Sequence, residues 1–165
     1  MKYGSLHDLY LNELRDLYNA ENQIVKALPK MMEAVQSTQL RAALSSHLEQ
    51  SRGHVTRLEQ VFKLHNEEAK GKTCKGMEGI IDEGKEIVSH RDNRDVLDAG
   101  IIANLQKAEH YETAGYGSVR TWAQQMGHNQ AAQILQQTLD EEKEADKKLT
   151  EIAGTLNVEA VRRAG

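Results

Sequence analysis

The sequence contains one proline, one cysteine and few aromatic residues: five tyrosines, one phenylalanine and one tryptophan among 165 residues. Strands favour aromatic and β-branched residues, so this composition argues against an all-β fold. The single cysteine cannot form an intramolecular disulfide, and the first ten residues, MKYGSLHDLY, contain no apolar stretch typical of a signal peptide or membrane anchor. We therefore expect a soluble cytoplasmic protein with no membrane partner.

Basic residues are not in surplus either. The chain has 21 lysines and arginines against 25 aspartates and glutamates, a net charge of -4, and both signs are spread along its length. Binding to a phosphate backbone depends on a local excess of positive charge, so we expect no nucleic-acid partner. The sequence also lacks a glycine-rich phosphate loop, paired cysteines and a recognisable Ser/His/Asp set. These absences argue against nucleotide use, structural zinc sites and acyl transfer.

What the sequence does contain is a helical repeat of apolar residues, which recur every three or four positions over four long segments and one shorter segment. Ser5 is the expected N-cap of the first helix, Pro29 is expected to kink it, and Gly127 is expected to end the third long helix. We predict a single domain over residues 1–165, with a frayed tail at 157–165. The predicted helices cover residues 5–35, 38–67, 76–89, 94–126 and 129–154.

These lengths predict an all-α fold, specifically a ferritin-like four-helix bundle made of two antiparallel hairpins. The short extra helix at 76–89 lies in the connection between the hairpins, and about 25 residues are enough for that connection to cross the length of such a bundle. Met77, Ile80, Ile81 and Ile87 give the short helix more apolar surface than a covering element needs. From this surface we expect a homodimer.

Acidic side chains fall on the apolar stripes of three helices. On a helical wheel, Glu21, Glu112 and Glu142 lie at the centre of their stripes, Glu109 lies at the edge of its stripe, and Asp146 lies one turn beyond Glu142. Glu112 and Glu142 are equally far from the turn that joins their helices, so they should face each other. Any single acid could be hydrogen-bonded across a bundle or reach solvent, but several acids at one height indicate a site.

The second long helix contributes imidazoles and an amide at the same height. His47 lies inside its stripe, with Gln50 and His54 on the flank, and Glu21 should lie opposite a point between Gln50 and His54. Ionised carboxylates at mid-bundle need compensation, yet no lysine or arginine lies at the centre of any stripe. This favours a divalent metal, and oxygen donors with one or two imidazoles suit iron or manganese better than zinc.

Five short strings of the sequence are distinctive: LPK at 28–30, HLE at 47–49, CKGMEG at 74–79, EHYE at 109–112 and LDEEK at 139–143. Through these strings the chain resembles the bacterial YciE/YciF ferritin-like stress-protein family from about Ser5 to Ala153, nearly its whole length. The resemblance implies a rubrerythrin- or ferritin-related four-helix bundle, often dimeric, with a dinuclear metal centre and no established reaction.

The sequence departs from related bundles at two ligand positions. Ferritins and rubrerythrins carry Glu-x-x-His on the second and fourth helices, whereas this chain pairs Gln50 with His54 and Glu142 with Asp146, each four residues apart. The family usually has Glu where this chain has Gln50. An amide binds iron weakly, so the resemblance implies one weakened metal position, unless His54 replaces the ligand, and therefore one ion or an asymmetric pair.

The predicted function is redox chemistry at this centre. One or two iron or manganese ions would react with a small oxidant, either to oxidise ferrous iron or to remove peroxide. The alternative is a non-catalytic dimeric stress-response bundle that acts through protein contacts, with its buried acids protonated or paired. The predicted metal ligands are Glu21, His47, Gln50, His54, Glu109, Glu112, Glu142 and Asp146.

Other polar residues receive simpler interpretations. We expect Glu141 to belong to a solvated helix face, and His110 and His128 to be solvated. Tyr116 lies on the stripe of the central acids, where it could hydrogen-bond a ligand or simply pack. Cys74 is flanked by lysines, which would lower its pKa and make it reactive, although an inert thiol is the simpler reading.

Overall fold

The computed structural model describes residues 4–90 and 92–162, and within these ranges the chain forms five α-helices and no β-strand. The expected all-α class is confirmed. Among the described residues, no helix combines the length and apolar character needed to span a bilayer. The helices are α1 (Leu6–Ala34), α2 (Thr38–Leu64), α3 (Lys75–Ser89), α4 (Arg94–Gln125) and α5 (Asn129–Arg162).

Side-chain caps fix where the helices begin. The Ser5 hydroxyl accepts a hydrogen bond from the Asp8 backbone N–H at 3.1 Å, as the sequence predicted for the start of α1. The Ser37 hydroxyl does the same for Leu40 at 3.2 Å, and Asn93 caps α4. Each cap satisfies a backbone donor that has no partner inside the helix, which stabilises the helix by about 1 kcal/mol.

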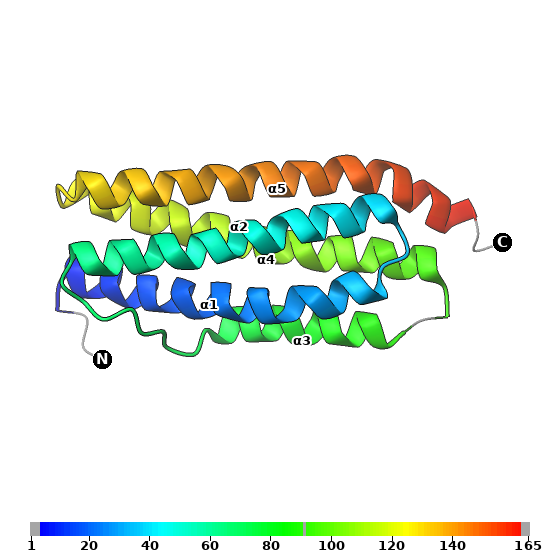
Figure 1. Ribbon diagram of the computed structural model, residues 1–165, viewed down its shortest axis with the longest axis horizontal. Helices are drawn as coiled ribbons and strands as arrows, with labels where there is room; N and C mark the ends of the chain where they lie inside the picture. The colour runs from blue at the N-terminus through cyan, green and yellow to red at the C-terminus, as the bar shows by residue number, and fades with distance from the viewer. Residues whose placement is uncertain (1–3, 91, 163–165) are drawn as a thin grey trace.

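The helices are arranged as two antiparallel hairpins with α3 outside them. α1 and α2 form one hairpin and α4 and α5 the other, while α1 packs against α4, α2 against α5, and α3 against both α1 and α4 (Figure 1). The connection through α3 runs along the molecule, so that α4 begins at the end where α1 finishes (Figure 1). There the Asp98 carboxylate accepts hydrogen bonds from the backbone of Gln36 at 3.0 Å and Ser37 at 2.8 Å.

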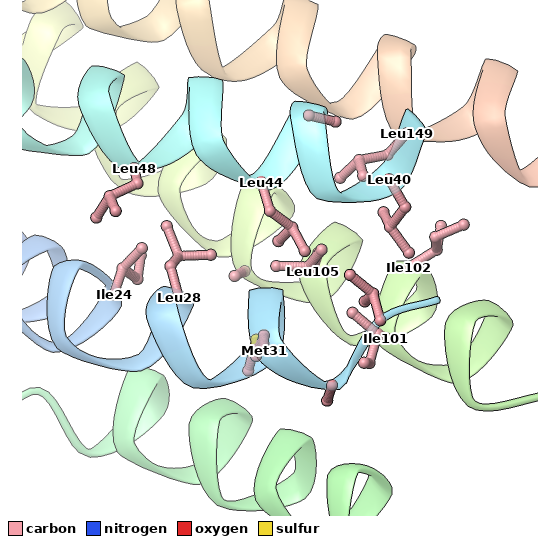
Figure 2. Close-up of a cluster of buried hydrophobic side chains, with 14 of the residues drawn as sticks. Ile24, Leu28, Met31, Leu40, Leu44, Leu48, Ile101, Ile102, Leu105 and Leu149 are labelled. Atoms are coloured by element: carbon pink, nitrogen blue, oxygen red, sulfur yellow. The ribbon is translucent and has the colours of Figure 1, made fainter. Parts of the chain in front are cut away.

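The apolar core consists of two separate clusters. One surrounds the α1–α2 turn and includes Leu28, Leu44 and Ile101 (Figure 2). The other lies at the opposite end of the long helices and includes Tyr10 and Phe62. Burial of each such side chain contributes about 1.5–3 kcal/mol, so the two clusters stabilise the fold on either side of a polar middle.

The predicted fraying of the C-terminal tail is wrong for residues 157–162. α5 continues to Arg162, and Leu156 is 9% exposed because it packs into the cluster around the α1–α2 turn. Beyond this contact the helix continues with side chains that are mostly exposed. The remaining part of the predicted tail, residues 163–165, lies outside the described residues.

The apolar face of α3 is used inside the chain. Met77 and Ile81 are buried in the cluster around the α1–α2 turn, so they do not form the exposed surface from which a dimer was inferred. Gly84 lets α3 approach closely, since a Cβ at this position would lie 2.5 Å from the side-chain oxygen of Asn104 on α4. The homodimer stays a prediction, without this argument for it.

Cys74 is not the exposed, activated thiol that its lysine neighbours suggested. Its side chain is fully buried at the N-terminus of α3, and its sulfur lies 3.0 Å from the Tyr111 hydroxyl. Tyr111 in turn donates a hydrogen bond of 2.6 Å to Asp16. Burial, together with the Asp16 carboxylate, raises the pKa of Cys74, so the thiol is an inert part of the packing.

Candidate metal centre

The polar middle of the molecule is made of carboxylates and imidazoles with almost no exposure to solvent. Their exposed fractions range from 0% for four of them to 7% for His47. They are buried because each lies on the apolar stripe of its helix, between the two apolar clusters. The residues are Glu21 from α1, His47 and His54 from α2, Glu109 and Glu112 from α4, and Glu142 from α5.

The ligand atoms of these six residues form two overlapping groups, within each of which all the chosen atoms lie within 4.8 Å of one another. The shared member is Glu142, so its carboxylate faces both groups. The His47 group consists of His47, Glu109, Glu112 and Glu142. The His54 group consists of Glu21, His54 and Glu142.

Many of these buried atoms have no hydrogen-bond partner. Both carboxylate oxygens of Glu112 and of Glu142 are unpartnered, as is Nδ1 of His54. His54 Nδ1 lies 2.8 Å from Glu142 Oε1 and 3.1 Å from Glu21 Oε1, yet neither approach has hydrogen-bond geometry. Leaving a buried polar group unpaired costs about 1–3 kcal/mol, and more for a charged one. The donor set therefore fits a divalent cation, which would pair several such atoms at once.

Burial and mutual repulsion favour the protonated carboxyl groups in the His47 group. Desolvation, followed by the charge of Glu142 and of Glu21, raises the pKa of Glu109 and of Glu112 well above the ordinary value. Desolvation also acts on Glu142, but the adjacent His54 outweighs it and lowers the pKa of Glu142. A cation at this position would replace the protons that these groups otherwise hold.

The pKa values of the two histidines are shifted in opposite directions. Burial lowers the pKa of His47, so this side chain is neutral and has a lone pair to offer. Burial also disfavours the charged form of His54, but the carboxylates of Glu142 and Glu21 outweigh it and raise the pKa of His54 to about 11. Without a metal, His54 is thus an imidazolium held between two acids.

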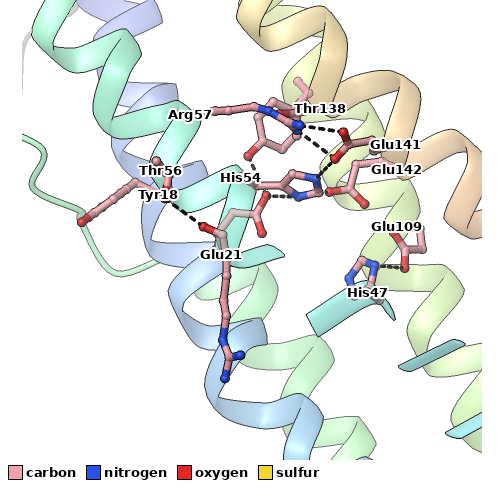
Figure 3. A network of polar contacts seen from close by, with 12 residues as sticks. Tyr18, Glu21, His47, His54, Thr56, Arg57, Glu109, Thr138, Glu141 and Glu142 are labelled. Atoms are coloured by element: carbon pink, nitrogen blue, oxygen red, sulfur yellow. Dashed lines mark hydrogen bonds and ion pairs between the residues drawn. The ribbon is translucent and has the colours of Figure 1, made fainter. Parts of the chain in front are cut away.

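A chain of side chains on the other side of the ring orients His54. Its Nε2 is hydrogen-bonded to Glu141 at 2.8 Å, and Arg57 donates two hydrogen bonds to the same carboxylate, at 2.8 and 2.6 Å (Figure 3). Arg57 is the main reason that the pKa of Glu141 is lowered. Metal-binding histidines commonly donate their second ring nitrogen to a carboxylate in this way, which directs the first nitrogen to the metal.

The expectation that Glu141 lies on a solvated face is wrong, and Arg57 was missed altogether. Arg57 follows His54 by three residues on α2, so both project from neighbouring positions on one side of the helix. That spacing is a signal in the sequence, but it does not identify the partner, which comes from α5.

Tyr116 holds the acid of the first helix. Its fully buried hydroxyl donates a hydrogen bond of 2.6 Å to Glu21 Oε1. Burial and the nearby acids Glu21 and Glu112 raise the pKa of Tyr116 well above the ordinary value, so it remains a hydrogen-bond donor. One oxygen of Glu21 is therefore engaged, and the other, Oε2, has no partner.

Of the predicted acid and histidine ligands, Asp146 lies outside both groups. The amide Gln50 is half-buried and lines a cavity together with His47 and Glu109. Asp146 accepts a hydrogen bond of 3.0 Å from Gln106 and lies 3.3 Å from His110 Nε2, on a partly exposed face. One turn beyond Glu142, the helix has carried the Asp146 side chain away from the buried middle.

A small cavity of about 30 Å³ lies beside the His47 group, among residues of α2, α4 and α5. A water molecule needs about 10–15 Å³ measured in the same way, so the space suits water or a similarly small molecule. The lining is mostly apolar and ends in a lysine. The residues around it are Ala43, Leu44, Ser46, His47, Gln50, Leu105, Glu109, Ala145, Lys148 and Leu149.

Fold and site together define an all-α protein with a buried carboxylate–histidine cluster that could hold a metal. The chain belongs to the family described as Domain of unknown function (DUF892), which matches residues 5–162. The resemblance seen in the sequence is thereby confirmed.

Known relatives match the chain in sequence and structure over nearly its whole length. Protein YciF of Escherichia coli (strain K12) is 39% identical over 166 residues, covering 99% of this chain and 100% of the relative. The crystal structure of the E. coli stress protein YciF matches with a TM-score of 0.90, over 93% of this chain and 97% of that one. YcfI from Rhodopseudomonas palustris, described as a candidate structural protein, matches at 42% identity with a TM-score of 0.88, over 90% and 95%.

Proposed function

We propose that the chain is a ferritin-like four-helix bundle that binds one or two iron or manganese ions and acts in the bacterial stress response. The observation that carries the proposal is the set of buried, unpartnered ligand atoms in the His47 group and the His54 group. Carboxylate oxygens and imidazole nitrogens without thiolates are the donors that iron and manganese prefer. The proposed ligands are Glu21, His47, His54, Glu109, Glu112 and Glu142.

Some side chains around the proposed centre would bind the metal, and others orient these ligands. Glu142 belongs to both groups, and one of its oxygens lies 2.8 Å from His54 Nδ1, so its carboxylate could serve both positions once a metal replaces the proton of His54. Glu141 and Arg57 fix the ring of His54, and Tyr116 fixes Glu21. The two apolar clusters exclude water from the middle of the bundle, which strengthens every electrostatic contact made there.

The cavity beside His47 supports a small substrate. Its volume suits oxygen or hydrogen peroxide and excludes larger molecules. Metal held by these residues would supply the electrons: reduction of peroxide to water takes two electrons, one from each of two divalent ions, and two protons. In the other reaction ferrous iron bound by the same residues would be the substrate, and each ion would lose one electron to the oxidant. We propose one of these two reactions as the activity.

One observation favours the non-catalytic alternative. In the absence of metal, His54 is an internal cation between Glu21 and Glu142, and it compensates part of the buried charge without any ion. A dimeric bundle that acts through protein contacts would need nothing more. In that case the acids of the His47 group would stay protonated.

Metal analysis separates the two functions. The full chain, expressed with iron and manganese supplements and purified without chelator or nickel resin, should carry between one and two ions per chain. Glu142→Gln, which alters both groups, should reduce the bound metal at least tenfold. Glu49→Gln removes an acid that is exposed on α2 and should leave the metal content unchanged.

The outcomes are distinguishable. Protein that is metal-free and does not bind added ferrous or manganous ion contradicts the metal centre and supports the structural alternative. Protein that binds metal, but turns over neither peroxide nor oxygen in the presence of ferrous iron, contradicts only the proposed redox reactions.

A further inference from the structure

Three histidines from separate chain segments meet at the end of the molecule where α1 begins and α2 finishes. His7 lies in the first turn of α1, His65 is the C-cap of α2, and His128 lies in the turn between α4 and α5. Their ring centroids are 5.8 Å apart for His7 and His65, 5.8 Å for His7 and His128, and 4.7 Å for His65 and His128. None of them belongs to the mid-bundle centre.

The spacing of the rings is that of a three-histidine metal site. With metal–nitrogen bonds of about 2.0–2.1 Å in a tetrahedral arrangement, the ring centroids of coordinating imidazoles lie about 5 Å apart. The three rings already have this spacing, although their nitrogens do not converge within 4.8 Å of one another in this structure. His7 and His128 are only half-buried, so rotation of their side chains can bring the nitrogens together.

The surroundings of His65 prepare it as a ligand. Its Nε2 lies 3.0 Å from the hydroxyl of the buried Tyr10, and when Nε2 carries the proton it donates to that oxygen and leaves Nδ1 free. Burial, followed by the neighbouring His128 and His7, lowers the pKa of His65, which keeps this ring neutral. Neutral imidazole is the form that binds metal.

Glu67, the acid that acts on His65, is engaged by Arg15 at 2.7 Å. An open hollow of about 300 Å³ gives access to two of the three rings, since it is lined by His65 and His128 together with Gly127. A purely imidazole donor set suits zinc or another borderline ion better than the hard, carboxylate-bound ions of the mid-bundle.

We propose that His7, His65 and His128 form a second metal site, which takes a zinc-like divalent cation and fastens the start of α1 to the end of α2 and to the α4–α5 turn. The site is independent of the mid-bundle centre and of its proposed reaction. Water or a small anion would complete the tetrahedron, and the hollow beside His65 and His128 has room for it.

Zinc titration followed by NMR of the histidine ring nitrogens tests the site on the full chain. Added Zn²⁺ should shift the ring signals of these three histidines together. His128→Ala and His7→Ala should each weaken the binding at least tenfold, and both variants should fold because neither side chain is fully buried. His90→Ala, at an exposed position outside the cluster, is the matched control and should bind zinc as the unchanged chain does.

Two results would overturn the site. One is an absence of shifts at these three rings, including the case in which zinc shifts only His47 and His54. The other is unchanged zinc affinity in both alanine variants. Neither result depends on whether the mid-bundle centre binds iron or manganese.

Discussion

The two groups of the candidate metal centre share Glu142 but hold their histidines differently. In the His54 group, the ring is fully buried and its Nε2 is bonded to Glu141, which Arg57 fixes in turn. In the His47 group, Nδ1 lies 3.4 Å from Glu109 without hydrogen-bond geometry, and the ring lines a cavity. One group is thus pre-organised and closed, whereas the other is less constrained and open to small molecules.

The groups also differ in what a metal must displace. His54 has a pKa of about 11, so a metal at the His54 group competes with a tightly held proton. His47 is neutral, but the raised pKa values of Glu109 and Glu112 mean that these acids must lose protons instead. Both groups must therefore release protons to bind a cation, the His54 group from an imidazolium and the His47 group from carboxylic acids.

The largest expected effect comes from removing an acid that belongs to the His47 group alone. Glu112→Leu should weaken metal binding at this group by more than about 100-fold, because loss of a ligand costs more than the roughly 10–100-fold typical of residues that only support a ligand. The metal affinity of the His54 group should change only a few-fold. Because both Glu112 oxygens are buried and unpartnered, the metal-free variant should be more stable than the unchanged chain by about 1–4 kcal/mol. Metal stoichiometry and urea unfolding of the metal-free protein measure the two effects.

A control and a contrary result define this test. Glu144→Gln changes an acid that is 71% exposed on α5, and should alter neither quantity. Equal loss of metal at both groups would show that the two are a single site. A metal-free Glu112→Leu variant that is strongly destabilised would show that the Glu112 carboxyl group makes a stabilising hydrogen bond in the metal-free protein.

The bracing of His54 can be removed without touching a ligand. Glu141→Gln should weaken binding at the His54 group by about 10–100-fold, because the ring loses the carboxylate that fixes its orientation and tautomer. Binding at the His47 group should be unaffected. Calorimetric titration with manganous ion, with ring-nitrogen NMR of His47 and His54, resolves the groups, and unchanged binding in this variant would contradict the bracing role.

Because protons and metal compete for the same groups, we expect the stability of the metal-free protein to fall with rising pH and the metal affinity to rise. A group whose pKa is raised by folding stabilises the native state below its unfolded pKa, and this stability is lost as the pH rises toward its folded pKa. His54, raised from 6.5 to about 11, and the raised Glu109 and Glu112 all act in this direction. The metal-free protein should therefore lose at least about 1 kcal/mol between pH 6.5 and 8.5.

Metal affinity should rise over the same range, because binding releases these protons. Urea unfolding at several pH values, with and without manganous ion, gives both curves. The curves should diverge as the pH increases, and parallel curves would mean that the buried groups do not exchange protons for metal.

The smallest expected effect comes from a substitution at the cavity beside the His47 group. Gln50→Glu introduces a carboxylate at the cavity beside His47 and Glu109. Affinity at the His47 group should rise by no more than about tenfold, which corresponds to 1.4 kcal/mol, because position 50 is half-buried and a carboxylate there stays partly hydrated. A larger gain, or an equal gain at the His54 group, would place residue 50 among the ligands.

The sequence predicts the helices well but their partners only in part. The helix periods place Glu21, Glu112 and Glu142 at stripe centres, and the structure buries all three. His54, placed only on the flank of its stripe, is nevertheless fully buried in the structure. Asp146 shows the limit of this reasoning, because a single turn of helix moves it from the buried middle to a partly exposed contact with Gln106.

The apolar repeat within one helix does not predict which residues of another helix its polar side chains will contact. Glu141 neighbours a buried ligand in sequence and turns by about 100° to meet Arg57 on α2, which no pattern within α5 specifies. For Cys74 the inert reading is confirmed and the reactive alternative is wrong, since the thiol is buried and the lysines that flank it in sequence do not lower its pKa. The three histidines at the bundle end lie in three different segments and carry no shared motif.

The sequence by itself determined the all-α class, the five helices and the central acids, because helix formation and amphipathic burial depend on residues three or four positions apart. The tertiary structure alone decided which flanking polar groups join the centre, how His54 is oriented, and which histidine remains open to the cavity. These features depend on the relative rotation and height of four packed helices, where a change of one residue turns a side chain from the core toward solvent.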